Sequence, residues 1–90
     1  MARMGMDVDQ VEKAGHDLQN RSADIDALIN TIEGLVSNLP SIWDGKDAQM
    51  FVTQWWPEHK AHLVKVSGSI AGLGRSALAN ASEQRNVSGH

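Results

Sequence analysis

The stretch Pro40-Ser-Ile-Trp-Asp-Gly-Lys-Asp47 lies at the middle of a 90-residue chain, between two segments whose apolar residues recur with helical spacing. Pro40 disfavours the helical backbone conformation for the residue before it, so a helix arriving from the N-terminal side should end there. Gly45 can adopt a positive φ angle where the chain reverses. Asp44 or Asp47 can cap the helix that follows, and either carboxylate suits the positive end of its dipole. These residues predict a tight turn between two helices.

Trp43 is the unusual residue of this turn, because a large aromatic side chain in a polar segment needs apolar surroundings for its ring. The groove between the two helices that the turn joins is the nearest place that supplies them. We therefore expect the ring of Trp43 to lie in that groove and the turn to fold the helices against each other.

The first helix is expected at about residues 8–39, after a disordered segment 1–6. Asp7 and Gln10 form a variant of the capping box, which marks a helix start. Apolar residues then follow in steps of three and four, the spacing of a helix that packs along one face. Its seam consists of Val11, Ala14, Leu18, Ile25, Leu28, Ile32, Leu35 and Leu39, with Arg21 in its one gap. We expect Arg21 either to extend its charge into solvent or to meet a carboxylate of a partner.

The second helix is expected at about residues 47–80, after a turn at 40–46. Pro57 lies inside it, and an interior proline either kinks a helix or begins a new one. We expect a kinked, continuous helix, because the apolar spacing runs through Pro57 unbroken; the alternative is a separate short helix at 46–56. Gly68 and Gly72 point away from the seam, which predicts a weak, fraying stretch and not a close glycine crossing. The polar tail 81–90 is expected to be disordered.

Two helices do not bury all of these apolar residues, and this predicts a partner. An antiparallel helix-turn-helix hairpin has one internal interface, so its broad stripes would remain partly in contact with water. Dimerisation of an all-α hairpin into a four-helix bundle would cover them. The expected partner interface comprises Arg21, Phe51, Trp55, Trp56, His59 and Leu63.

Composition excludes several classes of function. The net charge of −3 argues against nucleic-acid binding, and the absence of cysteine removes disulfides and thiolate metal sites. No apolar run is long enough for a membrane span, and the N-terminus lacks the apolar core of a signal peptide. His59 and His62 share a helix face, but two ligands do not make a zinc site. No catalytic arrangement of side chains suggests itself, so we expect neither an enzyme nor a cofactor.

The central turn also carries a family motif, Trp43-Asp44-Gly45. A chain of about this length, with Trp-Xaa-Gly between two helical halves and no signal peptide, resembles the WXG family. These ESAT-like proteins are exported by type VII secretion systems. Phe51 and Trp55 shortly after the turn are in keeping with the family, and the resemblance covers essentially the whole chain.

The resemblance implies a secreted, non-enzymatic protein that forms a homodimer or a heterodimer with a related chain. It also implies export of the folded dimer by a membrane machine driven by a type VII secretion ATPase. Many family members carry a Tyr-xxx-Asp/Glu export signal after the second helix, whereas this sequence contains no tyrosine. A partner chain or another feature of the tail would then supply the signal. Two alternatives are a membrane-active secreted protein, which would use Phe51, Trp55 and Trp56, and an intracellular helical adaptor.

Overall fold

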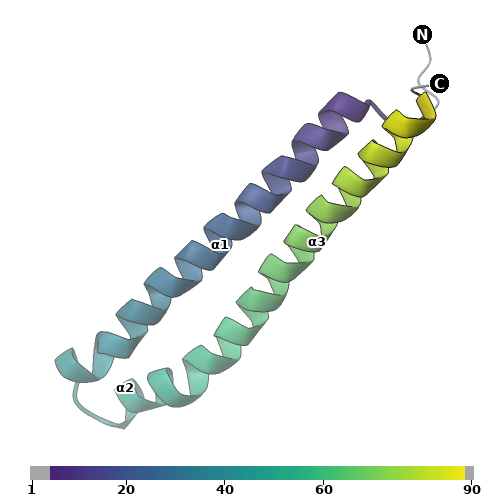
Figure 1. The fold of residues 1–90 in the computed structure, drawn as a ribbon. Coiled ribbons are helices and arrows are strands. Elements are labelled where there is room, and N and C mark those ends of the chain that lie inside the picture. The colour runs from purple at the N-terminus through teal and green to yellow at the C-terminus, as the bar shows by residue number, and fades with distance from the viewer. Residues whose placement is uncertain (1–4, 89–90) are drawn as a thin grey trace. The chain divides into compact units, whose positions relative to one another are not determined.

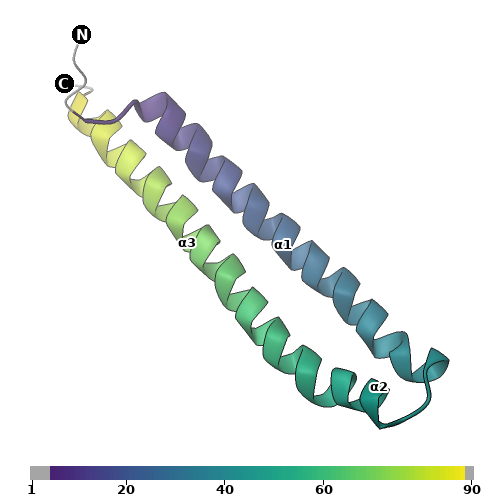
Figure 2. The ribbon, with the colours of Figure 1, turned by 180° about the vertical axis from the view of Figure 1, so that it is seen from behind.

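The structure is a computed structural model, and it describes residues 5–88. All secondary structure in these residues is helical (Figure 1): α1 (Val8–Ile42), α2 (Lys46–Met50), the π-helix η1 (Phe51–Trp55) and α3 (Trp56–Ser88). The chain forms two compact units, one from residues 1–22 and 68–90 and the other from residues 23–67. Within each unit, a part of α1 lies antiparallel to a part of the second helical segment, as the views in Figures 1 and 2 agree.

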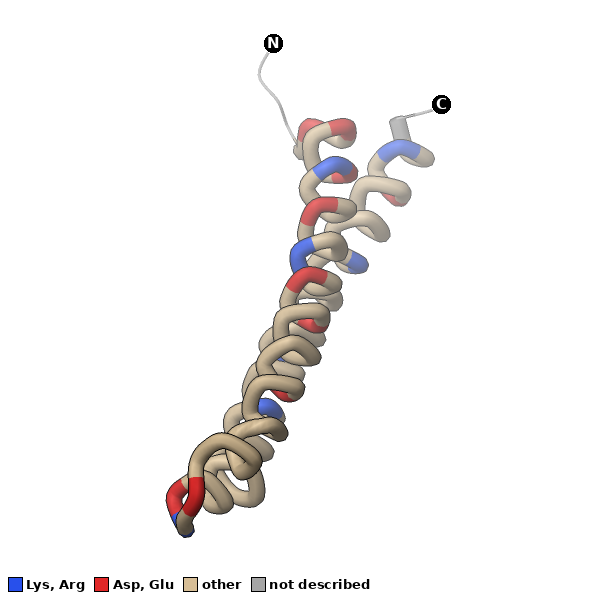
Figure 3. The backbone as a smooth tube through the Cα atoms, turned by 90° about the vertical axis from the view of Figure 1, so that its left-hand side faces the viewer, with Lys and Arg blue, Asp and Glu red and all other residues tan. Residues whose placement is uncertain are grey.

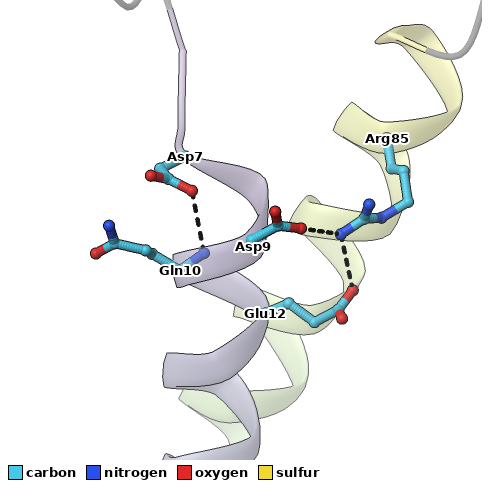
Figure 4. A network of polar contacts seen from close by, with 5 residues as sticks. All are labelled: Asp7, Asp9, Gln10, Glu12 and Arg85. Atoms are coloured by element: carbon cyan, nitrogen blue, oxygen red, sulfur yellow. Dashed lines mark hydrogen bonds and ion pairs between the residues drawn. The ribbon is translucent and has the colours of Figure 1, made fainter.

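The start of α1 follows from its cap. The side chain of Asp7 accepts a hydrogen bond from the backbone N–H of Gln10 at 3.2 Å (Figure 4). This bond satisfies one of the N–H groups that a helix leaves free at its N-terminus. The carbonyl of Asp7 accepts the first intrahelical hydrogen bond, from the N–H of Val11 at 2.9 Å. The helix therefore begins at Val8, where the capping pattern places it.

The C-terminal end of α1 differs from the expected one. The helix continues through Pro40 to Ile42 instead of ending at Leu39. The backbone N–H of Trp43 donates to the carbonyl of Leu39 at 2.8 Å, and Ser41 Oγ donates to the carbonyl of Asn38 at 2.7 Å. Pro40 lies within the last turn and lacks the N–H that would donate to the carbonyl four residues earlier. The turn is correspondingly shorter than the expected 40–46.

Gly45 has the backbone conformation that the turn requires. Its φ angle is 124° and its ψ angle 176°, a region that is essentially restricted to glycine. Gly45 is itself the N-cap of α2, and no side chain makes a capping hydrogen bond there. The expectation that Asp44 or Asp47 caps this helix by a hydrogen bond is therefore wrong. Asp47 lies in the first turn, where its charge still suits the helix dipole.

The second helical segment passes through Pro57 without leaving a helical conformation. Five residues of π-helix, Phe51–Trp55, end two residues before the proline, and the N–H of Trp56 donates to the carbonyl of Phe51. In a π turn each N–H donates to the carbonyl five residues earlier instead of four. Pro57 is the second residue of α3, which follows the π-helix without a break.

The tail is helical, which corrects the expected disorder of residues 81–90 as far as the structure describes them. α3 extends to Ser88. Ala81 is fully buried, and Arg85 Nη2 lies 3.0 Å from Asp9 Oδ1 and 3.3 Å from Glu12 Oε2 (Figure 4). Both carboxylates that pair with Arg85 belong to α1. Residues 1–4 and 89–90 lie outside the described residues.

In the first unit, two glycines bring the helices together. A Cβ atom on Gly74 would lie 2.8 Å from the carbonyl oxygen of Gly15, and one on Gly15 would lie 3.0 Å from that of Gly74. Gly68 has open space around it, as the pattern predicted. A Cβ atom on Gly72 would meet only the side chain of Arg75, so the expectation that Gly68 and Gly72 form no close crossing is confirmed. The close crossing of this unit is made by Gly74 with Gly15, which the apolar pattern did not predict.

In the second unit, the packed side chains are few and mixed in character. Ile29, Ala48 and Trp56 are buried, and Ser67 is buried in the same unit. Ser67 Oγ donates to Asp26 Oδ1 at 2.6 Å, which satisfies the buried hydroxyl. A core this small leaves most of the large apolar side chains of the unit in contact with solvent.

Candidate interaction surfaces

A row of rings follows the turn. The ring centroids of Trp43 and Phe51 are 5.7 Å apart, and those of Phe51 and Trp55 are 5.5 Å apart in an edge-to-face arrangement. The rings of Trp55 and His59 stack with centroids 3.9 Å apart. His59 Nδ1 lies 2.7 Å from the carbonyl oxygen of Trp55, which fixes the orientation of the imidazole. We call Trp43, Phe51, Trp55 and His59 the aromatic row.

The tryptophans of the chain differ sharply in burial. Trp56 is 5% exposed, whereas Trp43 is 42% and Trp55 48% exposed. The expectation that Trp43 lies in the groove between the helices is therefore wrong. Its ring rests against Phe51 because α1 runs past Pro40, so that Trp43 follows a longer helix than expected.

The aromatic row borders a hollow with an acidic rim. The hollow has a volume of about 480 Å³. Its walls are formed by Trp43, Asp47, Met50, Phe51, Gln54, Trp55 and Glu58. Two carboxylates and no lysine or arginine line it, so its electrostatic character is negative. We call this feature the turn hollow.

An apolar stripe on α1 recurs every seven residues on its exposed side. Leu28 is 58%, Leu35 66% and Ile42 74% exposed. In the second unit, Val66 on α3 is half exposed as well. Leu28 comes one position before the buried Ile29, and Val66 one position before the buried Ser67. Because the two right-handed helices run antiparallel in this unit, both exposed positions fall on the same side of the pair. We call Leu28, Leu35 and Val66 the apolar face.

The same unit also contains an ion pair between α1 and α3. Lys60 Nζ lies 2.6 Å from Glu33 Oε1, beside a hollow of about 530 Å³ that Trp56 and Lys65 also line. The hydrogen bond from Lys60 is the main cause that lowers the pKa of Glu33. The indole N–H of Trp56 adds a smaller contribution in the same direction, but it makes no hydrogen bond of standard geometry within the described residues.

Arg21, which interrupts the apolar seam, is exposed and lies 3.6 Å from Asp17 one turn earlier on α1. Its side chain is 59% exposed, so a charge in solvent and a pair with a partner carboxylate both stay predictions for this residue. Acidic residues recur along the part of α1 that belongs to the first unit, as the red segments of the backbone tube in Figure 3 show. Arg85 forms ion pairs with two of these residues, Asp9 and Glu12, and their carboxylates raise the pKa of Arg85.

The predicted site residues thus divide into three groups. The structure brings Trp43, Phe51, Trp55 and His59 into one row, whereas Trp56 belongs to the core and Leu63 is half-buried. Asp44 and Gly45 shape the turn without lining the hollow. Sequence reasoning missed Asp47, Met50, Gln54 and Glu58 as wall residues.

Other kinds of site are absent from the part of the chain that the structure describes. Residues 5–88 contain no group of three potential metal ligands, so His59 and His62 have no third ligand nearby. None of the helices in this range has the length and hydropathy needed to cross a membrane. No protein-family model, curated protein or solved structure matches the chain.

Proposed function

We propose that this chain is a secreted, non-enzymatic protein of the WXG type that acts by associating with a second helical hairpin. The observation that carries the proposal is the apolar face. Leu28 and Leu35 are one heptad apart and more than half exposed, and Val66 is half exposed, which is the pattern of a surface that a partner helix covers. Covering such a face in a four-helix bundle removes it from water. The partner is a second copy or a related chain.

The turn supports the same proposal. Trp43-Asp44-Gly45 forms a short, exposed reversal whose glycine has a φ angle open to few other residues. An exposed tryptophan at the end of a hairpin is available for recognition by another protein. We propose that the ATPase of a type VII secretion system reads this turn on a dimer, with any tyrosine-based signal supplied by the partner chain.

The proposal is tested by export from a host that carries a type VII secretion system. The chain should appear in the medium only when the secretion ATPase is active, and Trp43→Ala should reduce its export severalfold without changing its level in cells. Ala27→Glu, an exposed change on α1 outside the turn, serves as control. Retention of the chain in the cell pellet, while a known substrate of the same system reaches the medium, would instead favour an intracellular adaptor.

Membrane activity is the second candidate, and exposure of the aromatic row favours it, since aromatic side chains partition to membrane interfaces. The acidic walls of the turn hollow oppose it on anionic bilayers. Leakage of dye from phosphatidylcholine and phosphatidylglycerol vesicles separates the two candidates. We expect no leakage at concentrations where the protein is fully associated; leakage that Trp55→Ala abolishes would establish the membrane activity.

A further inference from the structure

We propose that the turn hollow binds an arginine side chain of a partner polypeptide. The inference concerns a surface apart from the apolar face, and it does not depend on export. Three aromatic rings meet at the hollow, and Asp47 and Glu58 lie in the same walls. Rings attract cations through their faces, and carboxylates attract them through charge and hydrogen bonds.

The geometry of the rings favours a planar cation. Trp43 and Phe51 are tilted by 42°, and Phe51 and Trp55 by 71°, so the row presents ring faces and edges in turn. A guanidinium group stacks flat on an aromatic face and still donates in its own plane to a carboxylate. A lysine ammonium is compact and strongly hydrated, and it gains less from such a site.

The apolar part of the hollow suits the stem of the same side chain. Met50 is half exposed in the wall beside the rings, and its flexible thioether adapts to an irregular ligand. The methylene groups of arginine would lie along Met50 and Phe51 while the charged end reaches the rim. A volume of about 480 Å³ is ample for one such side chain with its adjoining backbone.

The charge of the walls favours an arginine side chain over anionic and purely apolar ligands. The described wall residues include no lysine or arginine that could neutralise Asp47 and Glu58, so a carboxylate or phosphate ligand would be repelled. A purely apolar ligand would leave both carboxylates beside it without a partner and would lose their hydration. The arginine side chain satisfies rings and carboxylates together.

The probe is the blocked peptide acetyl-Gly-Arg-Gly-amide, added to the full-length chain labelled with ¹⁵N. Its citrulline counterpart has nearly the same shape without the charge. The three tryptophan indole N–H signals report the site. The arginine peptide should shift the signals of Trp43 and Trp55 saturably at millimolar concentrations and leave that of the buried Trp56 in place. The shifts should weaken as salt is raised, because the site is open to solvent.

Two variants give the matched comparison. Glu58→Gln keeps the shape of the wall and removes one charge, and it should weaken binding of the arginine peptide roughly tenfold, as expected for loss of a charge-assisted hydrogen bond. Glu83→Gln removes a charge from α3 away from the hollow and should leave binding unchanged. Circular dichroism and light scattering confirm that fold and association state are the same in both.

Three results would overturn the proposal. The first is equal shifts with the citrulline peptide, and the second is equal weakening by Glu58→Gln and Glu83→Gln. The third is an absence of saturable shifts at Trp43 and Trp55. Phosphatidylcholine vesicles are added in a parallel titration; shifts of the same two signals by vesicles but not by the peptide would assign the hollow to a membrane surface.

Discussion

The carbonyl oxygen of Gly15 lies so close to Gly74 that a single methyl group on Gly74 would meet it at 2.8 Å. Side chains separate most packed helices, whereas here the two backbones themselves approach each other. Leu78 and Leu18 lie at the same crossing, 2.8 Å and 3.3 Å from the positions that a Cβ atom on Gly15 and on Gly74, respectively, would occupy.

Gly74→Ala should therefore destabilise the chain by about 1–3 kcal/mol, the usual range for overpacking, although alanine has the higher helix propensity. Urea unfolding followed by circular dichroism measures the change. Gly68→Ala is the matched control on the same helix, because open space surrounds Gly68. That substitution should stabilise the chain by up to about 1 kcal/mol. Equal effects of the two substitutions would show that the close crossing does not limit stability.

Gly45→Val should destabilise the chain by about 1–3 kcal/mol, because a β-branched residue does not tolerate the φ angle of 124°. The space around Gly45 is open, so the effect comes from the backbone and not from a clash. Thermal unfolding measures it. Gly34→Ala, in the interior of α1 with open surroundings, should raise the midpoint instead. An unchanged midpoint for Gly45→Val would contradict the backbone conformation described for the turn.

Adjacent tryptophans should respond very differently to truncation. Trp56→Ala removes a buried side chain and should cost about 3–5 kcal/mol. Trp55→Ala removes one that is 48% exposed and rests on Phe51 and His59, and it should cost clearly less. The same urea titrations compare the two variants. A larger loss of stability for Trp55→Ala than for Trp56→Ala would contradict the burial described for the two side chains.

The pH dependence of stability should include a contribution from Glu33. Its pKa is lowered from the ordinary value of 4.5, chiefly by the hydrogen bond from Lys60. A carboxyl group whose pKa is lower in the folded state stabilises the protein above its unfolded pKa, and this contribution disappears as the pH falls through the folded pKa. Glu33→Gln should therefore reduce stability at neutral pH and make no difference in strong acid.

Urea unfolding of both proteins at neutral pH and at about pH 2 checks this expectation, because the contribution of Glu33 is lost across that interval. Glu83→Gln removes an exposed carboxylate of α3 and controls for the change in net charge. A difference between wild type and Glu33→Gln that persists undiminished in acid would contradict the role assigned to Lys60.

The sequence predicted the features that depend on neighbouring residues. Asp7 and Gln10 form the cap of α1, Gly45 has a positive φ angle, and the described chain is helical. These outcomes follow from bonds and angles within a few residues. The prediction for Pro40 was wrong: α1 continues two residues past it, and the N–H of Trp43, the residue after the helix, donates to the carbonyl of Leu39.

Features that depend on distant residues were not predictable from spacing alone. Gly15 and Gly74 are far apart in the sequence, and neither glycine indicates its partner. The helical tail has the same origin, since Arg85 acquires Asp9 and Glu12 only when α3 lies beside α1 in the first unit. The turn hollow depends on the π turn, which shifts Glu58 relative to the rings and has no clear signal in the sequence.

Association through the apolar face is the central claim, and Leu35→Glu tests it. A glutamate at this position, 66% exposed in the single chain, should leave the fold of that chain intact and place a charge inside the proposed bundle. Ala27→Glu adds the same charge to an exposed position of α1 outside the apolar face. Circular dichroism of each variant reports whether the helices persist.

The decisive measurement is the solution mass of the purified chain by light scattering on a sizing column. We expect wild type and Ala27→Glu to have twice the 9.8 kDa mass of one chain, and Leu35→Glu to have the mass of a single chain. If the wild-type protein alone has the mass of a single chain, the same column is run on its mixture with a related hairpin chain. That mixture should show the mass of a heterodimer, and Leu35→Glu should abolish the heterodimer. A helical wild-type protein that stays monomeric alone and with such a partner, or a dimer that Leu35→Glu leaves intact, would contradict the account.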